Sequence, residues 1–163
     1  DLDRDGDVDI LFTNGDEFEG GLPKEMDPYA VHGLAWLEND GAGGFTHHEI
    51  IRHWASYAVQ AADLDGDLDL DLVLSTVQLP DKHPTAPVMD LVWLENDGGM
   101  RFTRHDLAST PTHILALDTG DFNGDGKVDL VSGGMHVYPP FDRIGRVVLW
   151  TNNWPAVERR IRR

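Results

Sequence analysis

Aspartates stand at alternate positions in three short stretches of the sequence: DLDRDGDVD at residues 1–9, DLDGDLDLD at residues 63–71 and DFNGDGKVD at residues 121–129. Carboxylates this close together repel one another unless a cation neutralises them. Calcium collects six to eight oxygen ligands at about 2.3–2.6 Å, and a tight loop with acids at positions 1, 3 and 5 can aim them at one point. The spacing therefore predicts up to three Ca²⁺ sites.

The predicted ligands occupy positions 1, 3, 5, 7 and 9 of each loop. Gly6 and Gly126 stand at position 6, where a residue without a Cβ allows the positive φ of a sharp turn. Leu68 replaces this glycine in the second loop, so we expect its turn to be made differently and its site to bind more weakly. A lysine at position 7 suits a position that contributes only its backbone carbonyl. The predicted ligand residues are Asp1, Asp3, Asp5, Asp7, Asp9, Asp63, Asp65, Asp67, Asp69, Asp71, Asp121, Asn123, Asp125, Lys127 and Asp129.

Other interpretations of these loops fit less well. An EF-hand needs Glu at position 12 between two helices, whereas Phe12, Leu74 and Ser132 stand there and the flanks are strand-like. Mg²⁺ demands a tight octahedron and keeps several waters. Solvated acidic turns would leave the glycines at position 6 unexplained. We expect a structural role for the metal, because an ion held only by the folded loop adds its binding energy to folding.

Two motifs recur in the same order, about 60 residues apart, which indicates a tandem structural unit. The acidic loop is the first, and WLENDGAGGFTHHEI (36–50) reappears as WLENDGGMRFTRHDL (93–107), with a weaker copy in VLWTNN (148–153). Between the loops lie short runs rich in Val, Leu, Trp, Phe and Thr, bounded by Gly, Pro, Asn and Asp, which predict strands. Each unit is therefore a four-stranded antiparallel meander, the blade of a β-propeller. A β-sandwich would not explain the repeat.

The predicted fold class is all-β, a single partial propeller of about 2.5–3 blades over residues 1–163. The units span about 1–55, 56–112 and 113–163. The first has no strand before its acidic loop, and the third lacks the Gly-Phe-Thr that opens the last strand of the other two. Since a propeller typically has four to eight blades, we expect the partner of this chain to be the remainder of a larger propeller. The alternative is self-association of copies.

Composition excludes several classes of partner and site. The formal net charge of −16 disfavours nucleic acid and anionic membrane surfaces, which need a basic protein face. With no cysteine, the chain has no disulfide and no thiolate metal site. No apolar run approaches the roughly 18 residues of a membrane span, so we expect no membrane insertion. The 40% hydrophobic content, with five Trp and six Phe, is that of a globular protein.

The pattern D-x-[DN]-x-D-G-x-x-D-[LI], followed by a strand and combined with W-L-E-N-D-G…F-T, resembles the FG-GAP/VCBS repeats of integrin-α-like calcium-binding propellers. The resemblance covers nearly the whole chain and implies Ca²⁺ ligation at the loop positions named above. It places the acidic loops and the ENDG turns on one face of the blades. The segment TNGD…YAVHG…WLEN (13–39) is most similar to large secreted bacterial proteins, which implies an extracellular or periplasmic location.

The opposite face would carry three long connections, at 15–30, 77–88 and 133–145. Long loops on a rigid scaffold are the usual place for binding residues. Simple loop packing is one interpretation, a surface for glycan or protein is a second, and a histidine metal or catalytic site is a third. The candidate ligand-binding residues are Tyr29, His32, His53, Trp54, His83, His113, His136 and Tyr138.

Other aromatic residues have repeat equivalents that indicate structural roles. His48 and His105 match one another and are expected in outer strands, and Trp36 and Trp93 are expected in the blade core. No catalytic residue is assigned, because the acids are too many to single out a pair. The predicted function is a non-catalytic, calcium-stabilised binding or scaffold module of a secreted protein. The alternative is a fragment of a propeller enzyme such as a polysaccharide lyase.

Overall fold

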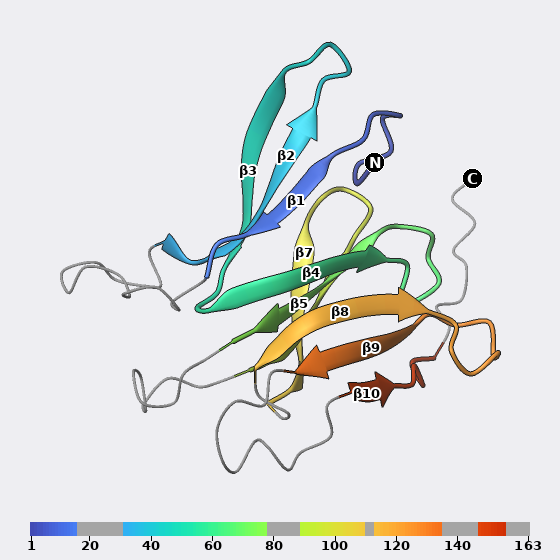
Figure 1. The fold of residues 1–163 in the computed structure, drawn as a ribbon. Coiled ribbons are helices and arrows are strands. Elements are labelled where there is room, and N and C mark those ends of the chain that lie inside the picture. Colours follow the sequence, from blue (N-terminus) through green and yellow to red (C-terminus); the bar gives the residue numbers. More distant parts are fainter. Residues whose placement is uncertain (16–30, 78–88, 110–112, 135–146, 156–163) are drawn as a thin grey trace, which may run out of the picture.

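The computed structural model describes residues 1–15, 31–77, 89–109, 113–134 and 147–155. Within them, ten strands form three antiparallel sheets (Figure 1). The first sheet, in the order β1-β2-β3, contains β1 (Ile10–Thr13), β2 (Gly33–Asn39) and β3 (Phe45–Arg52). The second, β4-β5-β6-β7, contains β4 (Ser56–Ala62), β5 (Asp71–Thr76), β6 (Leu91–Asn96) and β7 (Phe102–Ala108). The third, β10-β9-β8, contains β8 (Ile114–Gly120), β9 (Asp129–Gly134) and β10 (Val147–Trp150).

The second sheet is a complete four-stranded meander, and the predicted all-β class with propeller-type blades is confirmed. Strand β5 is buried along its whole length, because the sheet has a neighbouring sheet on each face. A strand buried on both faces reads as a continuous apolar run, which explains the sequence Leu72-Val73-Leu74 directly after an acidic loop. Strand β7, at the edge, is half-buried or exposed throughout.

The sheets repeat one another residue by residue. Trp36 of β2 lies opposite His48 of β3, and Trp93 of β6 lies opposite His105 of β7. A bulge interrupts each of these strand pairs at the same place, between Leu34 and Ala35 in the first sheet and between Leu91 and Val92 in the second. The two Trp-motif copies therefore adopt one structure.

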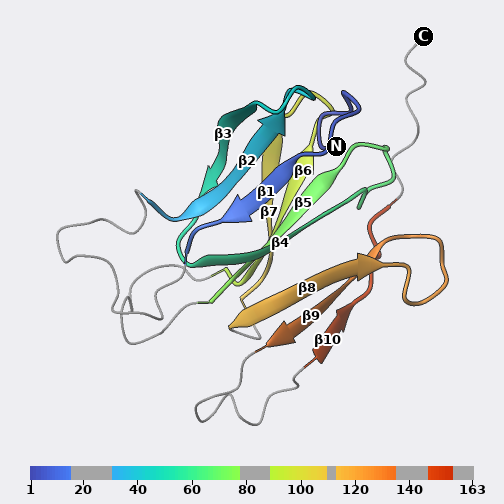
Figure 2. The same ribbon diagram turned by 45° about the horizontal axis from the view of Figure 1, so that its top comes forward.

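Apolar side chains between the sheets form two cores. One lies between the first and second sheets and contains buried Leu2, Leu34, Trp36, Leu72, Leu74, Val92 and Leu94. The other lies between the second and third sheets and contains Val73, Leu91, Ile114, Leu117 and Leu130. Strands β4 and β8 run side by side in both views (Figures 1 and 2). Burial of these side chains at about 25 cal/mol per Å² of apolar area is the main force that joins successive blades.

The third copy of the Trp motif is shifted by one residue. Leu149 pairs with Val131 as Trp93 pairs with Val73. Trp150 consequently pairs with Leu130 and takes the position of Leu94, on the face toward the second sheet. Its indole Nε1 donates to Ser132 Oγ at 2.9 Å. If VLWTNN is aligned with WLEN by matching the tryptophans, the result is therefore one residue out of step with the alignment of the two strands in the structure.

Within the described ranges, no helix has the length and apolar character needed to cross a lipid bilayer.

Candidate metal loops

The three acidic stretches form loops at equivalent places. Residues 63–71 join β4 to β5, residues 121–129 join β8 to β9, and residues 1–9 precede β1. All three lie along one side of the molecule, to the right in Figures 1 and 2. Each loop accepts a hydrogen bond from an asparagine at the end of β2, at the end of β6 or just after β10, where the turn begins, so loops and turns share one face, as expected.

Two loops bring three carboxylates within reach of one point. In each group, one oxygen from each of three acids lies within 4.8 Å of the others; the groups are Asp1, Asp3 and Asp9, and Asp63, Asp65 and Asp67. In the third loop, position 3 is Asn123, which offers a neutral amide oxygen, and this fully described loop forms no three-acid group. The chemistry of these donors is that of a hard cation, which prefers oxygen ligands.

The loop backbone requires two left-handed residues, not the one that the sequence indicated. Positions 4 and 6 both have positive φ in every loop: Arg4 at 67° with Gly6 at 103°, Gly66 at 85° with Leu68 at 81°, and Gly124 at 79° with Gly126 at 84°. The expectation that Leu68 makes the second turn differently is therefore wrong. Leu68 adopts the glycine conformation, which costs an L-residue about 1–2 kcal/mol. Whether this loop binds a metal more weakly stays a prediction.

Side chains at positions 1, 3 and 5 hold the loop in shape through backbone N–H groups. Position 3 accepts from the N–H of position 5 in each loop, at 3.2, 3.1 and 2.8 Å. Position 5 accepts from the N–H of position 7, at 2.9, 2.8 and 2.9 Å. At position 1, both oxygens of Asp63 and of Asp121 accept from the two left-handed residues. These hydrogen bonds orient the side chains at positions 3 and 5 in every loop, and at position 1 in the second and third.

Position 9 joins each loop to the neighbouring strand end. Asp129 is fully buried, and its two oxygens accept from Phe122 N at 3.1 Å and from Asn152 N at 2.7 Å. Asp9 and Asp71 make the same pair of bonds, to Leu2 and Asn39 and to Leu64 and Asn96. Each of these asparagines also donates its side-chain amide to the carbonyl of position 8. Sequence reasoning assigned position 9 to a metal alone and missed this clamp.

The side chain at position 7 lies against the turn that follows β2 in the first sheet and β6 in the second. A Cβ on Gly41 or Gly98 of these turns would collide with the carboxylate of Asp7 or Asp69. In the third loop, position 7 is Lys127, and its Nζ donates to Trp154 O at 2.7 Å. A lysine side chain thus contacts the same neighbouring segment that Asp7 and Asp69 contact in the other loops. This placement agrees with a backbone-only contribution of position 7 to a metal site.

Burial shifts the proton affinity of the second loop. Desolvation raises the pKa of Asp65, and the charges of Asp67, Asp63 and Glu95 raise it further. Desolvation also raises the pKa of Asp71 to about 6, against the hydrogen bonds that it accepts. Burial alone would raise the pKa of Asp9, but the hydrogen bonds from the N–H groups of Asn39 and Leu2 hold this pKa below the ordinary value.

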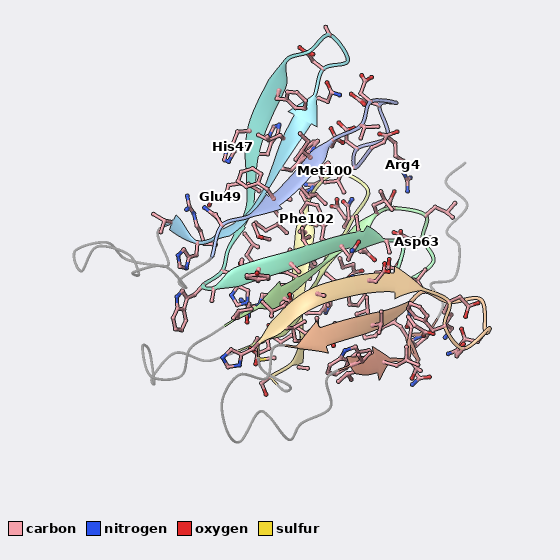
Figure 3. The ribbon with its side chains drawn as sticks, viewed as in Figure 1. Arg4, His47, Glu49, Asp63, Met100 and Phe102 are labelled. Atoms are coloured by element: carbon pink, nitrogen blue, oxygen red, sulfur yellow. The ribbon has the colours of Figure 1, made fainter. Side chains whose placement is uncertain are left out.

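Position 2 of each loop carries an apolar residue whose role sequence reasoning missed. Leu2 is buried in the core between the first and second sheets, and Leu64 packs against the next core. Phe122 has the same place in the third loop and is 49% exposed. The Arg4 guanidinium meets the Asp69 carboxylate at 2.7 Å, and so joins the first loop to the second (Figure 3 labels Arg4). The loops therefore contact successive blades as well as close their own.

The structure describes four of the predicted ligand-face residues, and all four are buried: His32, His53, Trp54 and His113. His32 Nδ1 accepts from Ala55 N at 3.3 Å, in the connection between β3 and β4. Their burial favours packing over contact with a ligand, and their binding role stays a prediction. Tyr29, His83, His136 and Tyr138 lie outside the described residues.

The repeated histidines are structural, as expected. His48 stacks on buried Trp36 with ring centroids 4.6 Å apart, and its Nε2 lies 2.6 Å from Glu38 Oε2. His105 stacks on Trp93 at 4.5 Å and meets Glu95 Oε2 at 2.6 Å. The two clusters are the same arrangement in successive blades.

Comparison with known proteins identifies the repeat. The FG-GAP-like repeat matches residues 1–74 and 86–132, which include all three acidic loops and cover more than half of the chain. No curated protein and no solved structure gives a significant match.

Proposed function

We propose, on the premise that this chain belongs to the FG-GAP-like repeat family, that it is a calcium-stabilised, non-catalytic binding or scaffold module of a secreted or cell-surface protein. One observation carries this proposal. Three carboxylates converge within 4.8 Å in each of two successive blades, on loops of the same conformation. Such an arrangement fits a cation that neutralises the repulsion between the acids.

Calcium suits the loops better than other ions. Side-chain oxygens would come from positions 1, 3 and 5 in the second loop and from positions 1, 3 and 9 in the first. With the carbonyl of position 7, these donors approach the six to eight ligands that Ca²⁺ takes. In the second loop, the buried Asp65 has a raised pKa, caused by desolvation and by neighbouring acids, so a bound cation would stabilise its ionised form. When bound, the ion supplies charge neutralisation and crosslinking of the loop, and no reaction chemistry.

Calorimetric titration of the metal-free chain with Ca²⁺ tests the proposal. Asp65→Asn should lower the affinity of one site by about tenfold, because affinity follows the number of charged ligands. Asp106→Asn removes the same charge from an exposed position on β7, paired with Arg104, and should leave all sites unchanged. Equal effects of the two substitutions would mean that Ca²⁺ responds only to net charge, and that the loops are not its sites.

The module would bind glycan or protein through the face opposite the acidic loops. The described histidines and Trp54 of that face are buried, so contact would use other residues of its long connections. Placement of ligand-binding residues on such connections is common on rigid scaffolds. A glycan array on which the calcium-loaded chain binds no sugar would remove glycan as the ligand.

Apolar side chains at the two outer sheets support a partner that continues the blade array. Ile10 and Phe45 of the first sheet are 46% and 51% exposed, and Val147 and Leu149 of the third are 69% and 49% exposed. Their equivalents in the second sheet, such as Leu72, Phe102 and Leu91, are covered by a neighbouring sheet. The partner is the remainder of a larger propeller or a second copy of this chain. This would be contradicted by a chain that light scattering shows to be a compact monomer at low micromolar concentration and that binds no hydrophobic dye.

A further inference from the structure

An apolar cavity of about 390 Å³ lies between the second and third sheets. Leu64, Leu91, Trp93 and Leu107 line it from the second blade. Leu130, Trp150 and Trp154 line it from the third. Its size falls within the roughly 300–1,000 Å³ of ligand pockets. The cavity continues the core that joins these two sheets, so its occupant can be read from the equivalent interface one blade earlier.

Between the first and second sheets, side chains at the same positions pack into one core. The repeat equivalents of Leu64, Leu91, Trp93, Leu107, Leu130 and Trp150 are Leu2, Leu34, Trp36, Ile50, Leu72 and Leu94, and all six belong to one continuous core. Met100 and Phe102 pack against that core. Figure 3 shows both side chains close to the first sheet. The space that is open between the second and third sheets is thus occupied, between the first and second sheets, by Phe102 at the start of β7 and by Met100 two residues before it.

The third sheet also leaves room for the strand that would carry such side chains. In the second sheet β6 pairs with β5 and with β7, whereas in the described part of the third sheet β10 pairs with β9 alone. Unpaired backbone N–H and C=O groups along a sheet edge are a template for another strand. The cavity and this edge lie together, because Trp150 is the last residue of β10 and Trp154 follows it closely.

The sequence directly after β10 does not carry the apolar pair. Met100 and Phe102 follow Asn96 by four and six residues, and Asn96 corresponds to Asn152 through its bond to the position-9 aspartate. The residues at the same offsets from Asn152 are Ala156 and Glu158. A methyl group and a carboxylate cannot replace a thioether and a phenyl ring in an apolar cavity.

We propose that this cavity and the outer edge of β10 form a docking groove for an extended peptide strand supplied by another polypeptide. The strand adds antiparallel to β10 and places apolar side chains at positions i and i+2, Met or aromatic, into the cavity. Backbone hydrogen bonds to the edge provide affinity, and the cavity provides specificity. The net charge of −16 favours Lys or Arg at the intervening and flanking positions, as Arg101 and Arg104 flank Phe102 in β7. The groove contains none of the predicted metal ligands, so this proposal does not rest on calcium binding.

A peptide with the sequence of residues 98–108, GGMRFTRHDLA, is the probe, and the calcium-saturated full chain is the receptor. We expect saturable binding, detected by tryptophan fluorescence and calorimetry. Replacement of the Met and Phe of the peptide by Asp should weaken binding at least tenfold. Trp154→Ala should weaken it by a similar factor, whereas Phe122→Ala should not, although Trp154 and Phe122 are 48% and 49% exposed. The Phe122 variant is therefore a matched control.

Three results would overturn the proposal. The first is no binding of the peptide to a folded chain. The second is binding that Trp154→Ala leaves unchanged, which would place the peptide elsewhere, for example in exchange for β7 itself. The third is binding that appears only in the full-length variant Val157→Asp, Ile161→Asp, which would mean that residues 156–163 occupy the groove.

Discussion

At the level of single residues, the aspartates of one loop perform different tasks. In the second loop, those at positions 1, 3 and 5 converge on a common point and also accept backbone N–H groups. In the first loop, the acids that converge are at positions 1, 3 and 9. Both oxygens of the aspartate at position 9 accept hydrogen bonds from backbone N–H groups. Position 7 faces the neighbouring turn. A run of alternate aspartates therefore combines ligands and structural acceptors, and only some of its charges depend on a cation.

Leu68→Gly tests the strain in the second loop. Leu68 is 63% exposed and has φ of 81°, so its side chain contributes little packing while its backbone is strained. The substitution should raise the free energy of unfolding by about 1 kcal/mol, measured by urea denaturation. Leu68→Ala removes the same side chain but keeps the Cβ, and should not stabilise. Equal stability of the Gly and Ala variants would contradict the strain argument.

Asp90 and His53 should give stability opposite pH dependences. Desolvation raises the pKa of Asp90 to about 7, and its Oδ2 accepts no hydrogen bond in the described chain. Desolvation, with the charge of Arg104, lowers the pKa of His53 to about 4. Between pH 3.8 and about 7 the folded state keeps the proton of Asp90, whereas the unfolded state has lost it. The contribution of Asp90 to stability is therefore complete below pH 3.8 and is lost as pH rises toward 7. Stability from His53 is lost as pH falls from 6.5 toward 4.

Asp90→Asn should consequently gain stability relative to the unsubstituted chain as pH rises from about 4 to about 7. The gain is at most about 1.4 kcal/mol per pH unit, the full linkage limit for one proton. Urea denaturation at fixed Ca²⁺ across this range measures it. Asp118→Asn, at an exposed position, is the control. A difference between variant and parent that stays constant with pH would show that Asp90 is ionised in the folded state.

At the level of elements, each blade is held by a clamp from loop to strand end. Asp129 accepts from the N–H groups of Phe122, in its own loop, and of Asn152, just after β10. Asp129→Asn turns an amide N–H toward one of these donors and leaves a buried group unpaired. It should destabilise the protein by about 1–3 kcal/mol, in EDTA as well as in Ca²⁺.

Asp125→Asn provides the contrast in the same loop. Asp125 is exposed, and an asparagine can still accept from Lys127 N. Its effect on urea denaturation should appear only in Ca²⁺, because the charge lost is that of a predicted ligand. If Asp129→Asn were as stable as the parent in EDTA, the clamp would contribute nothing of its own.

Much of this element structure could be predicted from the sequence, because the repeat recurs in phase. Two copies of the Trp motif with Trp36 and Trp93 predict matching strands, and both tryptophans are buried. The left-handed backbone at Arg4 could not be predicted, since arginine rarely adopts it. The register of Trp150 could not be read either, because it depends on which residue of β9 lies opposite. Partners of position 9 are far along the chain, and spacing alone does not reveal them.

At the level of the whole molecule, the loops, cores and sheet edges form a continuing array. The acidic loops lie along one side (Figures 1 and 2), and the first two place Leu2 and Leu64 in the cores shared with the next blade. A cation bound in a loop would therefore stabilise the contact between blades as well as the loop itself. The free energy of metal binding would be added to that of folding.

Thermal melting of the metal-free chain tests this central claim most directly. We predict that EDTA-treated protein, shown by elemental analysis to be free of metal, melts at a markedly lower temperature than protein in Ca²⁺. Ca²⁺ should restore the higher melting temperature more effectively than Mg²⁺ at the same concentration, because the loops offer many oxygens in a flexible arrangement. Identical melting temperatures with and without Ca²⁺ would contradict the account, and would mean that the aspartates need no cation.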